Sequence, residues 1–313
     1  MQGIDILEQN VADLSIDLLK TLLLDRTTEN YIKWATDIYS EYGREYAPEH
    51  EILPEIIIGE KTNVIQPRVS KSKEEQVKRT KDRAEVFTPS WVCNEQNNLI
   101  DDEWFGFPNV FNKTSKKKWK TNKKKVLFPK DKDWKAYVDD IRLEITCGEA
   151  PYLTSRYDTV SGSFIQVNDR IGILDRKLRV VNENTDNEDD WYKWAIRAVQ
   201  SIYGYDFQGD NILLARENII CTFIDNMIYR FGHEPLVNEL KEVAEILSWN
   251  IWQMDGLTLS VPYSEQIVQD SQLTLYDYMD IQNQNQSKEP IPCKIYDWKI
   301  DEPVLFKSIV GGE

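Results

Sequence analysis

Three short apolar segments, separated by stretches of helical periodicity, constrain the fold of this 313-residue chain more than any other feature. They lie within residues 142–153, 201–207 and 249–255, and the second and third carry Asp206 and Asp255 at their ends. Strands that alternate with helices form a parallel sheet, and ligands bind at the carboxyl edge of such a sheet. The sequence therefore predicts an α/β fold with polar side chains gathered at one sheet edge.

The rest of the chain divides around this core. We expect a helical region at 1–80, the core at 81–262, and a flexible loop with an edge segment at 263–313. Periodic apolar residues predict helices at 4–24, 30–42, 70–83, 134–138, 191–199, 211–226 and 236–247. Other expected features are a short strand at 56–58, a polar loop at 264–290, and a hairpin or edge strand at 293–310.

Composition limits the class of protein. Hydrophobic residues make up 41% of the chain, which is enough for a buried core. No apolar run approaches the roughly 18 residues that cross a bilayer, and the first residues lack the basic-then-apolar order of a secretion signal. The four cysteines form no CxxC pair and only two histidines are present, which argues against a disulfide scaffold or a zinc site. We expect a cytoplasmic protein with no membrane partner and no bound metal.

The net charge of −15 is unevenly distributed. Residues 113–125 contain eight lysines and no acid, so the rest of the chain carries −23. An acidic body repels a phosphate backbone, whereas one mobile basic loop can still bind it. Two interpretations stay open: a solvated loop, or a DNA-binding loop. In the second, the contacts would come from Lys116, Lys117, Lys118, Lys120, Lys123, Lys124 and Lys125.

The helix start that follows Thr88 is one candidate ligand-binding site. Pro89 bars Thr88 from helical backbone and starts a helix that Thr88 or Ser90 could cap. The free amide groups at such a helix start suit a carboxylate. An ordinary proline-started helix would give the same sequence pattern.

The sheet edge offers a second place. Gly148, in the turn after the first strand, allows a ligand to approach the backbone without meeting a side chain. Asp206 and Asp255 can each accept hydrogen bonds from hydroxyl or amine groups of a ligand. Alternatively, Gly148 belongs to an ordinary turn, and the two acids only make the strand ends soluble.

In this order the segments resemble the cofactor half of an N6-adenine DNA methyltransferase of the restriction–modification type. Val86–Pro89 matches the family's F-T-P segment, and Glu144–Leu153 matches its D-P-A-C-G-S-G turn. Gly204–Asp206 matches the family's second strand, which ends in an acid, and Leu214–Asn218 matches the L-A-x-x-N helix that follows. Met254–Gly256 matches the end of the third strand. The resemblance implies a Rossmann-like fold and S-adenosylmethionine as cofactor. The cofactor-binding residues that it implies are Phe87, Thr88, Pro89, Glu144, Cys147, Gly148, Asp206, Phe207 and Asp255.

One family feature is absent from the sequence. The family holds its flipped target base with an N/D/S-P-P-Y/F/W motif, and this chain contains no Pro-Pro pair. A second polypeptide could supply that motif, which would make the chain a subunit of a restriction–modification or phage-defence system. Alternatively the chain is a catalytically inactive binding or decoy protein, such as a DNA mimic. A third alternative is a Mg-dependent nuclease with a D-x-K motif at Asp297–Lys299, although that pattern recurs at Asp133–Lys135 and Asp175–Lys177.

Overall fold

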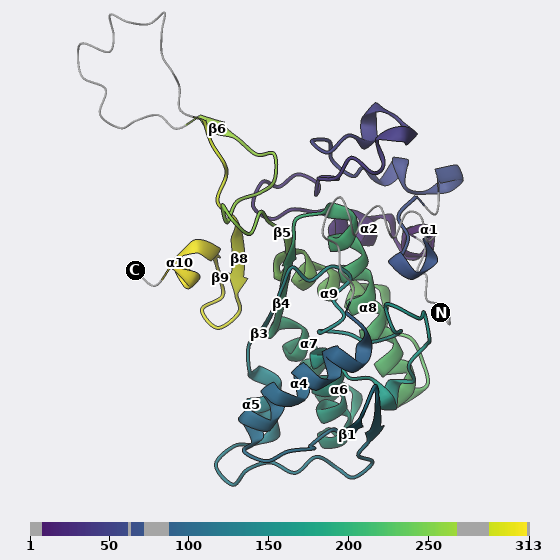
Figure 1. The fold of residues 1–313 in the computed structure, drawn as a ribbon, viewed down its shortest axis with the longest axis vertical. Helices are drawn as coiled ribbons and strands as arrows, with labels where there is room; N and C mark the ends of the chain where they lie inside the picture. Colours follow the sequence, from purple (N-terminus) through teal and green to yellow (C-terminus); the bar gives the residue numbers. More distant parts are fainter. Residues whose placement is uncertain (1–7, 62–63, 72–87, 268–287, 312–313) are drawn as a thin grey trace, which may run out of the picture.

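The helices pack around a three-stranded parallel sheet in the computed structural model, which describes residues 8–61, 64–71, 88–267 and 288–311 (Figure 1). The strands are β3 (Arg142–Ile145), β4 (Ile202–Asp206) and β5 (Ile251–Gln253), hydrogen-bonded in the order β3-β4-β5. The register places Ile145 beside Tyr205 and Asp206 beside Gln253, so the three strands end at one edge. The predicted α/β architecture with a parallel sheet is confirmed.

Four helices cover one face of this sheet, two in each connection between neighbouring strands (Figure 1). They are α6 (Ile173–Asn184), α7 (Glu188–Gln200), α8 (Gly209–Phe231) and α9 (Val237–Asn250). Parallel strands need such crossovers, because a tight turn reverses the direction of the chain. The Asn187 side chain caps α7 by accepting from the Asp190 amide, and Gly232, at a φ of 83°, ends α8. The sequence predicts α7, α8 and α9 but not α6.

The C-terminal segment covers part of the opposite face. Strands β8 (Lys294–Asp297) and β9 (Glu302–Leu305) form an antiparallel hairpin that leads into α10 (Phe306–Val310). The Phe306 ring lies 5.0 Å from that of Trp252, and the Tyr203 hydroxyl donates to the Tyr296 carbonyl. The hairpin predicted for the end of the chain is confirmed. It packs on β4 and β5 and leaves the side chains of β3 on this face exposed.

The N-terminal region shares its core with the rest of the chain. The apolar stripe predicted as one helix forms two, α1 (Glu8–Leu14) and α2 (Ile16–Leu23), because Ser15 between them is extended. Helix α2 packs against α9. Leu19 and Trp34 belong to the same buried cluster as Leu178 and Val243, so one core runs across the boundary predicted after residue 80.

Two predicted elements near the N-terminus are wrong. Residues 30–42 form no α-helix, and only the 3-10 turn at their end, Ser40–Tyr42, is helical. The Ile32 amide donates to Leu23 and the Trp34 amide to His50, and Ala35 has a φ of 51°. The aromatic residues there pack into the core around Trp34 instead of along a helix. No strand forms at 56–58: Ile56 ends the 3-10 turn Pro54–Ile56, which Pro54 starts, and residues 57 and 58 continue as a turn and a bend. Most of the helix predicted at 70–83 lies outside the described residues.

The remaining elements are short except for α4. They are α4 (Ser90–Phe105), β1 (Asn112–Ser115), β2 (Lys118–Thr121), α5 (Trp134–Asp139), β6 (Gln266–Ile267) and β7 (Lys288–Glu289), with 3-10 turns η1 (Ser40–Tyr42), η2 (Arg44–Tyr46), η3 (Pro54–Ile56), η4 (Gly59–Lys61), η5 (Arg68–Ser70) and η6 (Val167–Asp169). Helix α5 confirms the prediction at 134–138. Most of the loop predicted at 264–290 lies outside the described residues. Within the described chain, every helix is too short or too polar to cross a bilayer.

Candidate functional site

The turn after β3 and the end of β4 meet at the carboxyl edge of the sheet. The Gly148 amide donates a 3.0 Å hydrogen bond to Asp206 Oδ2, across 58 residues of sequence. Gly148 has a φ of 53°, which favours glycine, and a Cβ placed on it would meet no heavy atom within 4 Å. The sequence predicts both residues as ligand contacts, and the fold brings them together beside open space.

Asp206 is buried, with 8% of its surface exposed, and three donors hold its carboxylate. Besides Gly148, the Gln208 amide donates to Oδ1 at 3.0 Å and the Asn211 side-chain amide donates to the same oxygen at 3.3 Å. Burial raises the pKa of Asp206, and the nearby Asp210 raises it further, whereas these hydrogen bonds lower it. Since a carboxylate oxygen accepts two hydrogen bonds, Oδ2 keeps capacity for a ligand hydroxyl.

The Glu144 side chain, on β3, is hydrogen-bonded to the loop that follows Gly148. Its two carboxylate oxygens accept from the Tyr152 and Leu153 amides at 3.2 and 3.1 Å. Burial raises the pKa of Glu144 to about 8, and the charge of Asp206 adds to this rise. Glu144 therefore holds residues 152 and 153 against β3 from within the protein.

Two other predicted cofactor contacts also have structural partners. Cys147 is buried and its Sγ lies 3.3 Å from where a Cβ on Gly204 would sit, so its side chain packs into the core. Asp255 is half-buried, and its Oδ1 accepts from the Leu257 amide at 2.8 Å, closing the turn after β5. The backbone of this turn is joined to β4, because the Met254 amide donates to the Asp206 carbonyl at 2.9 Å.

The helix start after Pro89 already binds a carboxylate. The Ser90 amide donates to Asp158 Oδ2 at 2.8 Å, and the Thr159 hydroxyl donates to the Thr88 carbonyl. The predicted cap from Thr88 or Ser90 is wrong, since no side chain of the helix start caps α4. Thr88 and Pro89 thus serve to join α4 to residues 158–159, and Phe87 lies outside the described residues.

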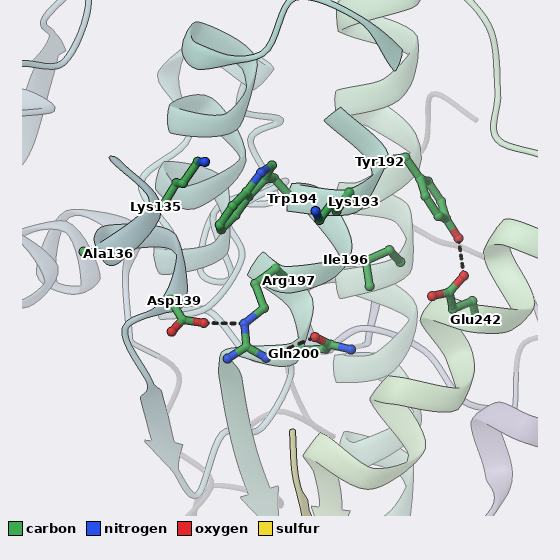
Figure 2. A pocket seen from close by; sticks show the side chains of 10 residues that line it. All are labelled: Lys135, Ala136, Asp139, Tyr192, Lys193, Trp194, Ile196, Arg197, Gln200 and Glu242. Carbon is green, nitrogen blue, oxygen red and sulfur yellow. Dashed lines mark hydrogen bonds and ion pairs between the residues drawn. The ribbon is translucent and has the colours of Figure 1, made fainter. Parts of the chain in front are cut away.

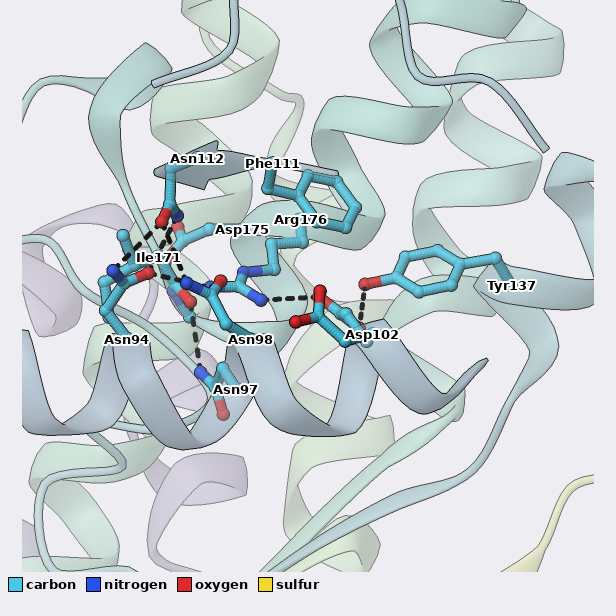
Figure 3. A network of polar contacts seen from close by, with 12 residues as sticks. Asn94, Asn97, Asn98, Asp102, Phe111, Asn112, Tyr137, Ile171, Asp175 and Arg176 are labelled. Atoms are coloured by element: carbon cyan, nitrogen blue, oxygen red, sulfur yellow. Dashed lines mark hydrogen bonds and ion pairs between the residues drawn. The ribbon is translucent and has the colours of Figure 1, made fainter. Parts of the chain in front are cut away.

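A buried polar network fixes α4, and with it Pro89, to the helical layer (Figure 3). The Arg176 guanidinium, on α6, donates to Asn94 and Asn98 at 2.9 and 2.8 Å and pairs with Asp101. The Tyr137 hydroxyl donates to the other oxygen of Asp101 at 2.9 Å. Arg176 Nε has no partner among the described residues, but the other hydrogen bonds of this network join α4 to α5 and α6 and favour one arrangement of these helices.

Aromatic rings flank the site on the side of β5. Phe207 and Tyr263, 37% and 52% exposed, have ring centroids 6.2 Å apart. Gln253 on β5 donates to the Phe207 carbonyl at 2.8 Å, and Lys33 Nζ donates to the Tyr263 carbonyl at 2.7 Å. Phe207 is among the cofactor contacts predicted from the sequence, whereas Tyr263 is not.

Buried polar atoms near Asp206 point to a missing hydrogen-bonding partner. Gln208 Oε1, Asn211 Oδ1, Trp34 Nε1 and Thr36 Oγ1 are all inaccessible, and none has a partner within the described part of the chain. The Gly209 amide donates to the Trp34 carbonyl, which brings residues 34–36 to the start of α8. Such atoms normally bind water, an ion or a ligand. No sequence signal marks Trp34 and Thr36, because they lie about 170 residues from Asp206.

The lysine-rich segment forms a hairpin. Strands β1 and β2 pair antiparallel, with Lys116 in the turn at a φ of 54°. Trp119 and Thr121 anchor the hairpin by donating to Asp169 at 2.8 and 2.6 Å, so much of the predicted lysine-rich loop has regular structure. The seven lysines named in the sequence analysis are all exposed.

Two cavities lie away from this edge, in the helical layer. The first, of about 640 Å³, lies between α5, α7 and α9, beside Asp139 and Gln200, which come just before the amino ends of β3 and β4 (Figure 2). The second, of about 620 Å³, is lined by Lys123 of the hairpin segment, by Arg179 and by Tyr229. Neither includes the predicted cofactor residues.

The described residues contain no group of three or more His, Cys, Asp or Glu side chains that could hold a metal ion. The first acid of each D-x-K pattern has a structural hydrogen bond. Asp133 accepts from the Ala136 amide, Asp175 from Ser155, and Asp297 from the Lys299 amide. Nothing in this part of the chain favours the nuclease alternative.

Comparison with known proteins adds no further assignment. No protein-family model, no curated protein and no solved structure matches this chain. The function of this chain is therefore inferred from the geometry of its sheet edge.

Proposed function

We propose that the carboxyl edge of the β3-β4-β5 sheet binds S-adenosylmethionine, in a Rossmann-like arrangement. The observation that carries this proposal is the hydrogen bond between the Gly148 amide and Asp206, since it joins a glycine turn and a strand-end acid in one site. The open space beside Gly148 and the unpartnered buried atoms of Gln208 and Asn211 fit a ligand there. The chain would then be the cofactor-binding subunit of an N6-adenine DNA methyltransferase.

The residues present suit the parts of this cofactor. Asp206 would accept from a ribose hydroxyl, and the exposed faces of Phe207 and Tyr263 would pack against adenine. When bound, the cofactor supplies an electrophilic methyl group. Its transfer to an amine depends mainly on positioning and on exclusion of water, which this chain's residues would provide.

Catalysis would also require residues that hold the target base. The sequence lacks the Pro-Pro motif of the family that it resembles, so a second polypeptide would supply the target-binding half. A chain with its own cofactor site and no target motif fits a subunit better than a complete enzyme.

Calorimetry with S-adenosylhomocysteine tests the cofactor site. We expect the native chain to bind it and Asp206→Asn to bind it at least about tenfold more weakly, because a hydrogen bond to a charged acceptor contributes about 1.5–3 kcal/mol. Phe207→Ala, at an exposed side chain, should weaken binding without disturbing the fold. Asp131→Asn, at an exposed loop aspartate, is the matched control and should bind as the native chain does. No binding by the native chain, or equal binding by Asp206→Asn and the control, would refute the proposal.

The β1-β2 hairpin is the proposed DNA contact. Its exposed lysines lie on one rigid hairpin, so they can meet neighbouring phosphates together. We expect Lys116→Ser, Lys117→Ser and Lys118→Ser, combined, to weaken duplex DNA binding and to reduce the slope of log K against log salt by about 2–3. The same three changes at the exposed Lys294, Lys299 and Lys307 serve as the control. Equal slopes for the two triple variants, measured by fluorescence anisotropy, would show that the hairpin lysines do not contact DNA and only interact with solvent.

A further inference from the structure

The second cavity of the helical layer, the hairpin cavity, lies beside the lysine-rich hairpin and has a volume of about 620 Å³. It is bounded by residues 121–123 at the end of the hairpin, by η6, by α6 and by α8. The Asn182 side chain, on α6, donates to Asn226 on α8 at 3.0 Å. Arg179, also on α6, donates to the Asn122 carbonyl at 2.6 Å. Hydrogen bonds between its walls thus fix a cavity within the range of small-molecule sites, roughly 300–1,000 Å³.

The acids in the cavity walls already have partners within the protein. The Thr121 hydroxyl donates to Asp169 Oδ1 at 2.6 Å, which holds the hairpin against η6. Glu183 pairs with Arg179 through one carboxylate oxygen and accepts from the Val126 amide at 2.7 Å through the other. Both acids and Arg179 therefore serve to join the walls.

Two further cations line the cavity. Lys123 is exposed and forms no ion pair or side-chain hydrogen bond with the described residues. Arg230 is exposed and donates to the Thr185 carbonyl at 3.0 Å, which leaves other guanidinium donors for a ligand. Positive groups that continue a row of exposed lysines suit the phosphates of a nucleic acid strand.

The cavity also offers an aromatic face and free amides. The Tyr229 side chain is 51% exposed, and in the described part of the chain it makes no hydrogen bond or ring contact. The exposed amides of Gln166 and Asn168 have no partner there either. A tyrosine ring stacks on the face of any base, and an amide pairs with the donors and acceptors of a base edge. A free phosphate would leave all three side chains unused.

We propose that the hairpin cavity binds one nucleotide of single-stranded DNA, with its base stacked on Tyr229 and its phosphate beside Lys123. The lysines of the β1-β2 hairpin would hold the neighbouring phosphates, so this inference rests on the proposed DNA contact of the hairpin. A base inside a duplex is paired and stacked between its neighbours, and it cannot reach Tyr229. The cavity therefore adds affinity for a single strand and none for a duplex.

Substitution of Tyr229 tests the stacking. In fluorescence anisotropy with a labelled thymidine oligonucleotide, Tyr229→Ala should bind at least about fivefold more weakly than the native chain. Its binding to a duplex should stay unchanged, which shows that the variant is folded. Tyr229→Phe keeps the ring and should bind the single strand as the native chain does. The matched control, Tyr42→Ala, changes a tyrosine that is 55% exposed in η1, outside the cavity, and should also bind as the native chain does.

Salt dependence separates the phosphate contact from the base contact. Lys123→Ser should reduce the slope of log K against log salt for the single strand by about 0.7, the value for one lost phosphate contact. Tyr229→Ala should weaken binding at every salt concentration and leave the slope unchanged, because stacking releases no counterion. A changed slope for Tyr229→Ala, or an unchanged one for Lys123→Ser, would contradict the proposed placement of the nucleotide.

The outcomes distinguish the cavity from the hairpin. Equal single-strand binding by Tyr229→Ala and Tyr42→Ala overturns the cavity proposal, and so does an equal loss of single-strand and duplex binding in Tyr229→Ala. In either case the triple lysine variants can still show that the hairpin contacts duplex DNA. A native chain that binds neither form of DNA overturns both proposals.

Discussion

Replacing Arg216 with methionine is expected to lower the free energy of unfolding by about 3–5 kcal/mol. Arg216 lies in α8 with no exposed surface, and its guanidinium donates to four backbone carbonyls. They are those of Leu22, Leu24, Ser248 and Ile251, at 2.6, 3.0, 3.1 and 2.8 Å. Methionine fills a similar volume but donates nothing, so these hydrogen bonds to buried carbonyls are lost.

The position of Arg216 explains why one side chain carries so large an effect. Its acceptors lie at the end of α2, the end of α9 and the start of β5, so the side chain joins segments up to 194 residues away. Burial lowers the pKa of Arg216 to about 9, which measures how costly the buried charge is, and the nearby Asp25 offsets part of this cost.

Urea unfolding followed by far-UV circular dichroism measures this loss. Arg230→Met is the matched control: it makes the same change in the same helix, where Arg230 is exposed and donates to the Thr185 carbonyl. The control should change stability by about 1 kcal/mol or less. If the two variants unfold at the same urea concentration, the four hydrogen bonds of Arg216 do not stabilise the fold as proposed.

Alanine at Gly209 is expected to lower the free energy of unfolding by at least about 2–3 kcal/mol. Gly209 begins α8, and a Cβ there would lie 2.0 Å from the Lys33 carbonyl oxygen and 2.9 Å from its carbon. Both are backbone atoms, so the segment around residue 33 would have to move. That movement would break the pair of hydrogen bonds between Gln253 and the Lys33 backbone, each 2.8 Å long.

Gly256→Ala is the control for crowding. A Cβ at Gly256 would have its nearest neighbour at 3.4 Å, on the Tyr205 ring, which is an ordinary contact distance. Thermal unfolding of the two variants should separate by several degrees, with Gly256→Ala close to the native chain. An unchanged midpoint for Gly209→Ala would mean that residues 33–36 do not lie against the start of α8.

The sequence predicts the sheet well because its signals are local. Ile202–Asp206 and Ile251–Gln253 are nearly continuous apolar runs, as expected for strands buried on both faces, and α8 and α9 have clear apolar periodicity. Gly148 and Asp206 are predictable for the same reason: each directly follows or ends a strand, and parallel strands present these positions at one edge.

Residues 30–42 show where local signals fail. Their apolar spacing matches a helix, yet their amides donate to Leu23 and His50 and their aromatic rings fill the core near α8. The pairing of Asp158 with the start of α4 is equally non-local, because the acid lies 68 residues from the amide that it accepts from. The spacing of apolar residues along the chain does not reveal such distant hydrogen-bond partners.

Periodicity and turn chemistry within the sequence alone determined the parallel sheet, three of its four crossover helices and the residues at its carboxyl edge, because these depend on neighbours a few residues apart. Only the tertiary structure decided that Glu144 and Cys147 face inward, that Tyr263 joins Phe207, and that the edge of β3 is open. Those outcomes depend on which distant segments compete for the same hydrogen bonds and the same space, and that competition is settled only when the chain packs.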